Sequence, residues 1–289
     1  MKQAIKYAFI DEHKLEFPIA AMCRVLYVNR SGFYAAQKRP SSLRSQQNVA
    51  IRERMIEIHA AQRSAPGTIK MWHLLKAEGI ACGRNRVRAL RRAAGIETLR
   101  TKRFRNMRNY QKTEPAAPDL VQRGFTMTKP NRAWVGDMTF IQTRQGSICL
   151  ATYSDLCTHR VTGWAIAASA TAKLAVTALQ NGLDRQKPPD GLICHTDQGS
   201  AYSSTMFRDH LRKNKMKPSM SRRGNCHDNA VAESFFSNLK NELTHHIIFD
   251  DQASAELAIN DYIGVYYNQQ RLHQSLDYRT PAQVEASHR

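Results

Sequence analysis

Three acidic side chains stand at positions from which they could act together on a phosphodiester. Asp137 is the only acid in the expected strand WVGDMTFIQT, Asp197 lies at the end of the later strand LICHTDQG, and Glu233 lies in a following helix. Two divalent cations about 4 Å apart can activate the attacking oxygen and stabilise the leaving oxygen of a phosphoryl transfer. Mg²⁺ is usually held by one or two carboxylates with water and phosphate oxygens. Three acids around one phosphate would therefore suffice, although each acid taken singly is better explained as a turn cap, a backbone acceptor or a solvated residue.

The helix that carries Glu233 places this acid at the edge of an apolar stripe. At about 100° per residue, one face of the helix is apolar and contains Ala232, Phe235, Phe236, Leu239 and Leu243. Glu233 and Lys240 lie together beside that face. The Glu233 side chain is thus expected to point into a cleft between the helix and a sheet, where Lys240 could bind a phosphate. The alternative for this pair is a salt link at the helix margin, which contributes little to stability.

Further residues near the acids are candidates for supporting roles. His195 precedes Asp197 by two residues, so both side chains emerge on one face of the strand. It either assists proton transfer or orients Asp197, and a histidine inside a strand is more often structural. The loop SRRGNCHD has the glycine and small polar residues of a segment that approaches a ligand closely. From this loop onward we expect Arg222 and Arg223 to contact the ligand and Asn229 to support the site.

The order of the expected elements predicts the fold. Three consecutive strands, from WVGDMTFIQT to RVTGWAIAAS, are followed by a helix, the strand LICHTDQG, a second helix and the short strand KPSMS. Such an order makes a mixed five-stranded sheet flanked by helices, and it suits an α/β, RNase H-like fold. In that layout the middle of the first strand and the end of the fourth can be neighbours, with a later helix packed across them.

The charge distribution predicts a polyanionic partner for the first part of the chain. The formal net charge is +19, from 43 Lys and Arg and 24 Asp and Glu. Residues 1–115 hold 24 basic and 8 acidic side chains, a net of +16, whereas residues 116–289 hold 19 and 16, a net of +3. Such an excess favours nucleic acid as the partner.

The same basic region contains two expected helical pairs. PIAAMCRVL is followed by Asn29 to Gly32 as a turn or cap and then a second helix, which is either a helix-turn-helix or an ordinary hairpin. The second pair comprises residues 67–79 and 83–95, each ending in glycine. Its basic face and the run after it supply candidate DNA contacts, which are Arg84, Arg88, Arg91, Lys102, Arg103 and Arg105. Simple solvation of a charged face is the alternative.

Composition also bounds the domains and the compartment. We expect a basic helical DNA-binding region over 1–115, a linker over 116–133, the catalytic core over 134–250 and a C-terminal helix and tail packed on the core over 251–289. The six cysteines form no CxxC pair, which indicates reduced thiols in a cytoplasmic, nucleoid-associated protein. No stretch approaches the roughly 18 apolar residues that span a bilayer, so no membrane partner is expected.

The acidic motifs resemble those of the DDE transposases and the retroviral integrase core. Asp137 in WVGDMTF, Asp197 in HTDQGSAY and Glu233 in AESFFSNLKNEL match the catalytic triad, and the last two acids are separated by 35 residues, the signature interval of that superfamily. The tail YNQQRLHQSLDYRTPAQ is similar to that of bacterial insertion-sequence transposases made from two overlapping reading frames. The likeness to their downstream-frame product covers nearly the whole chain. It is looser before residue 115, where PGTIKMW departs from the usual glycine and paired arginines.

The resemblance implies a reaction, cofactors and partners. Asp137, Asp197 and Glu233 would bind two Mg²⁺ ions, for which Mn²⁺ can substitute. Water would cleave a strand to free a 3′ hydroxyl, which then attacks another phosphodiester without a covalent enzyme intermediate. The implied partners are double-stranded DNA of the element ends and the target, the upstream-frame product or a fusion with it, and further copies of the chain assembled on DNA.

Two alternatives to a transposase stay open at this point. One is a DNA-binding accessory or regulatory subunit with an idle core, which the presence of all three acids and Lys240 disfavours. The other is an RNase H-like nuclease that cuts without joining. Both cutting and joining use the same set of carboxylates and differ only in which hydroxyl attacks, so residue types cannot separate them.

Overall fold

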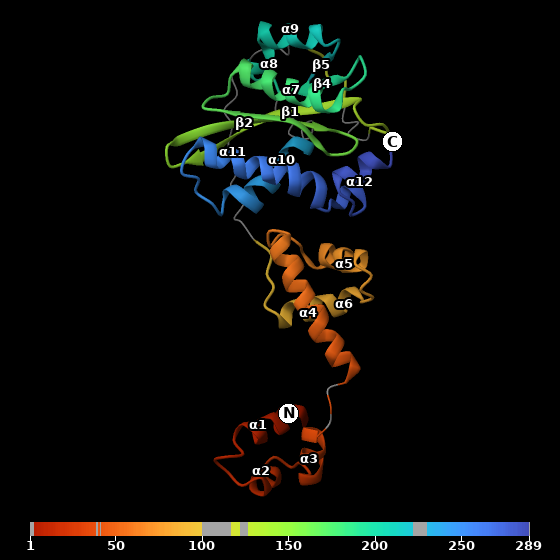
Figure 1. Ribbon diagram of the computed structural model, residues 1–289, viewed down its shortest axis with the longest axis vertical. Helices are drawn as coiled ribbons and strands as arrows, with labels where there is room; N and C mark the ends of the chain where they lie inside the picture. Colours follow the sequence, from red (N-terminus) through yellow and green to blue (C-terminus); the bar gives the residue numbers. More distant parts are fainter. Residues whose placement is uncertain are drawn as a thin grey trace. The chain divides into compact units, whose positions relative to one another are not determined.

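The computed structural model describes residues 3–38, 40, 42–99, 117–121, 127–221 and 230–288. The chain divides into two compact units, Met1–Arg54 and Met55–Arg289 (Figure 1). Helix α4 (Leu43–Ala61) begins in the first unit and ends in the second.

The first unit is a small helical cluster made of α1 (Gln3–Glu12), α2 (Ile19–Val25) and α3 (Arg30–Lys38). Its core consists of Ile10, Met22, Cys23 and Phe33. The predicted helix PIAAMCRVL is confirmed, and Asn29 caps α3 because its Oδ1 accepts a hydrogen bond from the Ser31 amide at 3.1 Å. The prediction that Gly32 belongs to the turn is wrong. Gly32 lies inside α3, where a Cβ would come within 2.6 Å of the Tyr7 hydroxyl, so its role is close packing against α1.

The second helical pair is confirmed within the second unit. Helices α5 (Thr68–Ala77) and α6 (Arg84–Ala93) pack against each other. Each is followed by a glycine with positive φ, which is 77° at Gly79 and 63° at Gly95, as the sequence predicts for helix ends. The Trp72 indole donates a hydrogen bond to the Cys82 carbonyl at 2.9 Å and so ties α5 to the connection before α6.

The remainder of the second unit is built on the predicted five-stranded sheet. Its strands are β1 (Ala133–Thr143), β2 (Gly146–Asp155), β3 (Val161–Ala167), β4 (Ile193–Thr196) and β5 (Lys217–Met220). They run in the order β3-β2-β1-β4-β5. The first three are antiparallel neighbours, whereas β1, β4 and β5 are parallel. This mixed sheet has the RNase H-like arrangement, which confirms the predicted fold class.

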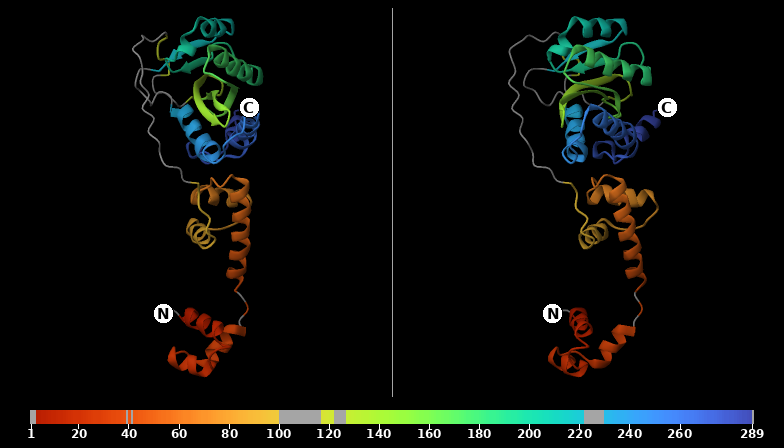
Figure 2. Two further views of the ribbon diagram at one scale, coloured as in Figure 1. Left: turned by 90° about the vertical axis from the view of Figure 1, so that its left-hand side faces the viewer. Right: turned by 60° about the vertical axis from the view of Figure 1, so that its left-hand side comes forward.

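Helices cover both faces of the sheet (Figure 2). One face carries α7 (Ala172–Gln186), α8 (Ser200–Ser203) and α9 (Thr205–Lys213). The other carries α10 (Ala230–Leu239), the π-helix η2 (Lys240–Thr244), α11 (Gln252–Asp261), the π-helix η3 (Tyr262–Gln270), the short η4 (Gln274–Leu276) and α12 (Pro281–Ala286). The apolar residues of β1 and β2 alternate between the two faces, so the sheet has a separate core on each side.

Two further expectations concern thiols and membranes. The described cysteines Cys23, Cys82, Cys149, Cys157 and Cys194 are free thiols, as predicted, and Cys226 lies outside the described residues. Across the described ranges, no helix combines the length and apolarity needed to cross a bilayer.

Candidate active site

The pairing of β1 with β4 brings the middle of β1, which carries Asp137, beside the end of β4, which Asp197 follows. In this parallel ladder Trp134 is opposite Cys194 and Val135 is opposite His195. The same register, extended by two residues, sets Asp137 opposite Asp197. Strand β4 ends at Thr196, so the two aspartates lie just beyond the paired segment. Neighbouring strands are about 4.8 Å apart, which is a suitable spacing for two carboxylates that share a ligand.

Asp137 is expected on the face of the sheet that α10 covers. Ala133, Val135 and Ile193 pack with Val231 and Ala232 of α10 in one apolar cluster. Trp134 and Cys194 belong to the cluster on the opposite face. Because side chains alternate along a strand, Asp137, two positions beyond Val135, emerges towards α10. Glu233 directly follows Ala232 of that cluster in the sequence, and its side chain is exposed.

Backbone amides orient the two aspartates. Asp137, only 4% exposed, accepts a hydrogen bond from the Met138 amide at 2.7 Å. Asp197 is half-buried and accepts one from the Gly199 amide at 2.9 Å. Such local hydrogen bonds limit the rotation of a short carboxylate and hold it in one orientation.

The carboxylates of Asp137 and Asp197 both affect the pKa of a buried tyrosine, Tyr202. The Tyr202 side chain on α8 is buried, and its hydroxyl has no hydrogen-bond partner among the described residues. Burial raises the pKa of Tyr202 well above its ordinary value, and interactions with Tyr153, Asp137 and Asp197 raise it further. Burial and the nearby Asp137 also raise the pKa of the Cys149 thiol to about 11. Asp137 therefore affects both Tyr202 and Cys149, and Asp197 affects Tyr202.

A second buried tyrosine, Tyr153, packs against β1 at a glycine, Gly136. Tyr153 on β2 is opposite Gly136 on β1, and its ring lies over that residue. A Cβ at Gly136 would approach the Tyr153 ring to 2.4 Å. The glycine directly before Asp137 is thus required by packing next to the aspartate pair.

His195 lies on β4, and its side chain contacts the neighbouring parallel strand β5. The ring is fully buried, and its Nδ1 lies 2.8 Å from the Ser219 Oγ on β5. That hydroxyl also accepts a hydrogen bond from the Leu120 amide at 2.9 Å. This contact ties the β4 end, which precedes Asp197, to β5.

Helix α10 has the predicted phase. Its buried residues are Val231, Ala232, Phe235, Phe236 and Leu239, with Leu243 continuing the stripe into η2. The Glu233 side chain is exposed, and Lys240 is half-buried. The backbone changes from α to π at Lys240, so the spacing of 100° per residue holds only as far as Leu239.

The three acids do not gather into a complete metal site in this structure. Among the described residues, no three His, Cys, Asp or Glu side chains are close enough together to hold one metal ion. Asp137 lies on β1, Asp197 directly follows β4, and Glu233 lies on α10. Helix α10 begins directly after residues 222–229, which lie outside the described residues.

Known proteins share these features over most of the chain. Residues 127–226 and 214–281 match models of the integrase core domain, and residues 46–104 match an HTH-like domain. An uncharacterized 31 kDa protein of insertion element IS600 from Shigella sonnei is 36% identical over 261 residues, which are 90% of this chain and 96% of that protein. Transposase InsF for insertion sequence IS3A from Escherichia coli (strain K12) is 34% identical over 283 residues, which are 97% of this chain and 98% of that one.

The chain belongs to the IS3-type family of DDE transposases. As a transposase of this family it is a polynucleotidyl transferase that acts on DNA. Among solved structures, it resembles the HTLV-2 integrase catalytic core domain in complex with magnesium, with a TM-score of 0.45 and 21% identity over 55% of this chain and 98% of that one.

The predicted DNA contacts of the transposase have different surroundings. Arg84 and Arg88 are exposed on α6, and the Arg84 guanidinium lies 4.6 Å from the centroid of the Trp72 ring. Arg91 is half-buried and donates to the Thr68 hydroxyl at 3.2 Å, which links α6 to α5. Several candidates lie outside the described residues, namely Lys102, Arg103, Arg105, Arg222, Arg223 and Asn229.

Sequence reasoning missed a buried carboxylate of the transposase, Asp155 at the end of β2. Its oxygens accept hydrogen bonds from the amides of Asn131, Cys157 and Thr158 and from the Thr158 hydroxyl, at 2.6 to 3.0 Å. Burial raises the pKa of Asp155, while these hydrogen bonds oppose that shift. Since four donors surround it, Asp155 is a structural residue that closes the β2–β3 turn. The Asx-turn pattern in SDLCT is the signal that points to it.

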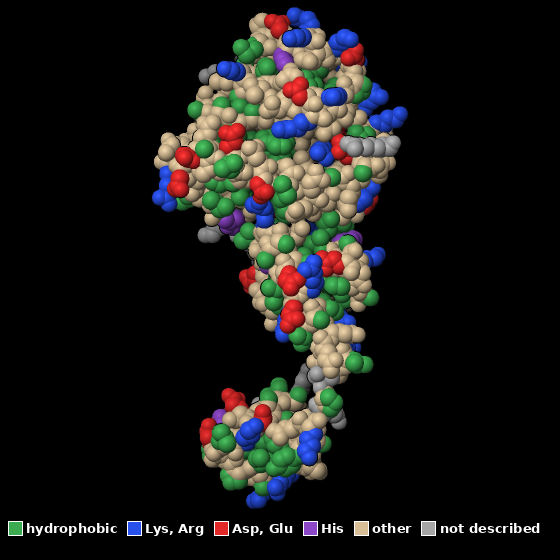
Figure 3. Space-filling model, in the orientation of Figure 1, with side chains coloured by type: hydrophobic (Ala, Val, Ile, Leu, Met, Phe, Trp, Pro, Cys, Tyr) green, Lys and Arg blue, Asp and Glu red, His purple; other side chains and the backbone are tan. Residues whose placement is uncertain are grey.

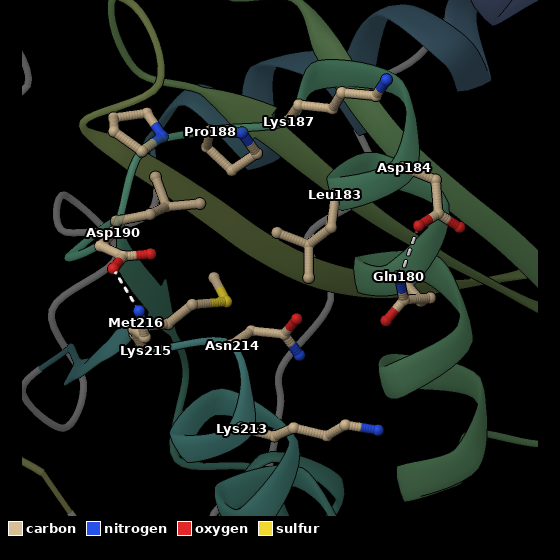
Figure 4. A pocket seen from close by; sticks show the side chains of 12 residues that line it. Gln180, Leu183, Asp184, Lys187, Pro188, Asp190, Lys213, Asn214, Lys215 and Met216 are labelled. Atoms are coloured by element: carbon tan, nitrogen blue, oxygen red, sulfur yellow. Dashed lines mark hydrogen bonds and ion pairs between the residues drawn. The ribbon is translucent and has the colours of Figure 1, made fainter.

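A cavity of about 340 Å³ lies at the other end of the parallel strands (Figure 4). Its lining includes Leu192 and Met216, which precede β4 and β5, together with Lys187 and Lys213. Lys215 there pairs with Asp190 at 2.7 Å. Figure 3 shows Lys and Arg side chains over this α9 end of the unit, with Asp and Glu among them. Asp197 follows the opposite end of β4, and neither Asp137 nor Asp197 lines the cavity.

Proposed function

We propose that this transposase cuts and joins DNA strands at a site made by Asp137, Asp197 and Glu233. The observation that carries the proposal is the β1–β4 register, which continues to Asp137 opposite Asp197. The effect of both aspartates on Tyr202 supports it. Glu233 would complete the site from α10, which packs against β1.

The donor set suits a hard divalent cation. Mg²⁺ is commonly bound by one or two carboxylates with water and phosphate oxygens, and two oriented carboxylates meet that requirement. We infer a pair of Mg²⁺ ions, replaceable by Mn²⁺, with Asp137, Asp197 and Glu233 as ligands. Bound there, the ions would supply activation of the attacking oxygen and stabilisation of the leaving oxygen.

The remaining roles belong to residues of the chain. The apolar cluster of Val135, Val231 and Ala232 would exclude water behind the carboxylates. His195 would hold the β4 end through Ser219, and Lys240 would bind a phosphate of the DNA strand. Strand cleavage by water would leave a 3′ hydroxyl and a 5′ phosphate. In the joining step that hydroxyl would form a new phosphodiester and expel a 3′ oxygen of the target, so the number of phosphodiesters is conserved.

The basic first part of the chain would supply DNA affinity. We propose that residues 1–115 bind DNA, that 116–133 form a linker, that 134–250 form the catalytic core and that 251–289 form a tail packed on the core. The exposed Arg84 and Arg88 are the described candidates for phosphate contacts. Element ends and target DNA would be the substrates at the nucleoid, with the upstream-frame product and further copies of the chain as partners.

A cleavage and joining assay tests the proposed site. Element-end DNA is incubated with the full chain and Mg²⁺ or Mn²⁺, with and without the upstream-frame product, and a pre-cleaved end reports joining. Asp197→Asn is expected to lower both activities by roughly 100-fold or more, because several kcal/mol of transition-state stabilisation are lost. Asp190→Asn, at the cavity beyond the other strand ends, is the matched control and should leave both unchanged.

Three outcomes would contradict the proposal. Persistent nicking by Asp197→Asn would remove this residue from the site. Nicking by the wild-type chain without any joining of the pre-cleaved end would indicate a nuclease. End binding that is indifferent to divalent metal and to loss of all three acids, without cleavage, would indicate an idle core.

A further inference from the structure

A buried ion pair joins the C-terminal segment to the helix that carries Glu233. The Arg271 Nε donates to both Glu242 carboxylate oxygens, at 3.0 and 2.9 Å, and its Nη2 donates to Oε1 at 2.8 Å. The two side chains are only 8% and 10% exposed. Arg271 follows η3, and Glu242 lies in η2, so the pair connects two segments on the same face of the sheet.

The hydrogen bonds of this pair extend beyond the two charges. Arg271 Nη2 also donates to the Asn238 Oδ1 on α10 at 2.8 Å. The Tyr262 hydroxyl donates to Glu242 Oε2 at 2.8 Å. Charged groups are costly to bury unless their hydrogen-bonding capacity is satisfied, and here both partners have several contacts. We call this set of Asn238, Glu242, Tyr262 and Arg271 the C-terminal clamp.

The clamp spans the point at which α10 changes its helical geometry. Asn238 belongs to the α-helical part and Glu242 to the π-helical part, which begins at Lys240. A π-turn shifts the helical phase, and such turns are rare and frequently occur at functional sites. Arg271 forms hydrogen bonds with residues before and after this junction. It therefore restrains both the position of the junction and the rotation of α10 about its axis.

A contribution to stability does not by itself account for a buried ion pair at this position. A buried ion pair is often no more stabilising than a well-packed apolar pair of the same volume, whereas its directional hydrogen bonds restrict the arrangements that are compatible with burial. The surrounding residues are apolar and aromatic, among them Leu239, Leu243 and Tyr267. An apolar replacement would thus be compatible with these surroundings, which points to an orienting role.

We propose that Arg271 is a positioning residue for Glu233. Through the C-terminal clamp it sets the rotation of α10 so that Glu233 is presented to Asp137 on β1 and to Asp197 after β4. This inference rests on the proposed function, since it requires Glu233 to be the third metal ligand. The reacting DNA need not touch Arg271, which acts through α10.

The test measures the metal concentration that gives half-maximal nicking of element-end DNA. Arg271→Gln is expected to raise that concentration at least 10-fold, while affinity for DNA without metal changes less than 2-fold. Arg271→Lys, which keeps the charge but lacks the bidentate fork, should recover part of the shift. Asn238→Ala removes one hydrogen bond of the clamp and should raise the concentration a few-fold in a chain that keeps the ion pair. This variant decides the question if the Arg271 variants fail to fold.

The matched control is a second ion pair of the C-terminal segment. Arg160 pairs with Glu285 of α12 at 2.9 Å, with exposures of 21% and 14%, and neither residue belongs to the C-terminal clamp. Arg160→Gln should leave the metal requirement within 2-fold of wild type. The inference would be overturned if folded Arg271→Gln had an unchanged metal requirement. If Arg271→Gln does not fold, an unchanged requirement in Asn238→Ala would overturn it instead. An equal shift in Arg160→Gln would also overturn it.

Glu233→Gln separates this inference from the proposed function. If Glu233→Gln abolishes nicking at every metal concentration while Arg271→Gln keeps a normal metal requirement, the site is supported and the positioning role is refuted. Normal nicking by Glu233→Gln would refute the proposed site itself, and with it the basis of the inference.

Discussion

The two faces of the central sheet are held in different ways. The face under α7 and α9 is closed by apolar side chains, including Trp134, Leu179 and Phe207. The face under α10 also has an apolar core, but it buries the ion pair between Glu242 and Arg271 in addition. Apolar burial stabilises many closely related arrangements, whereas a hydrogen-bonded ion pair is satisfied in few. The difference indicates that one face chiefly stabilises the sheet, while the other also orients the helix that carries Glu233.

Removing one member of the ion pair is expected to cause the largest loss of stability. Glu242→Ala would leave the Arg271 charge buried without its partner, at a cost of about 3–5 kcal/mol in the free energy of unfolding. Glu242→Leu combined with Arg271→Met should recover most of this loss, because an apolar pair of similar volume fits the same core. Urea unfolding followed by circular dichroism measures both. A double variant as unstable as the single one would mean that the pair itself stabilises the face, and the contrast between the faces would disappear.

A truncation on the opposite face should affect stability without affecting the site. Leu179→Ala opens a cavity beneath α7, and the expected cost is about 2–5 kcal/mol in the free energy of unfolding. At a temperature at which the variant stays folded, its metal requirement for nicking should match that of the wild type. A shift as large as that expected for Arg271→Gln would show that both faces orient the site.

The α10 face should also be the more sensitive to acid. Burial, Arg271, Lys70 and His159 lower the pKa of His273 to about 2 in the folded chain, from 6.5. The unfolded chain therefore takes up a proton below about pH 6.5 that the folded chain does not bind. The free energy of unfolding should fall by about 1.4 kcal/mol per pH unit from this group as the pH decreases below 6.5. Comparing the pH dependence of unfolding in the wild type and in His273→Gln isolates the effect, and equal slopes would refute it.

Most of the second unit could be predicted from local patterns. The alternation in WVGDMTFIQT and its neighbours predicts β1 to β3, and glycines mark the ends of α5 and α6. Helix α4 is harder to detect, because Ile51, Met55 and Ile58 are its buried residues within a largely polar sequence. The π-helices have no local signature, since they depend on how a helix packs against distant segments.

Part of the candidate site was also predictable, because it depends on local sequence patterns. The apolar stripe of α10 depends on a local period, so the phase of Glu233 relative to Ala232 follows from the residues themselves. The structural role of Asp155 could have been found from its turn motif. The partner of Glu242 could not, because Arg271 is 29 residues away and its charge gives no indication of which acid it meets.

The sequence by itself determined which residues have the chemistry for phosphoryl transfer, and it determined the faces that their local elements present. Only the tertiary structure decided that β1 and β4 are parallel neighbours in the register that leads to Asp137 and Asp197, and that Arg271 grips α10. The physical reason is the range of the interactions. Periodicity and caps act over a few residues, whereas strand register and a buried ion pair depend on contacts between segments that the chain separates widely.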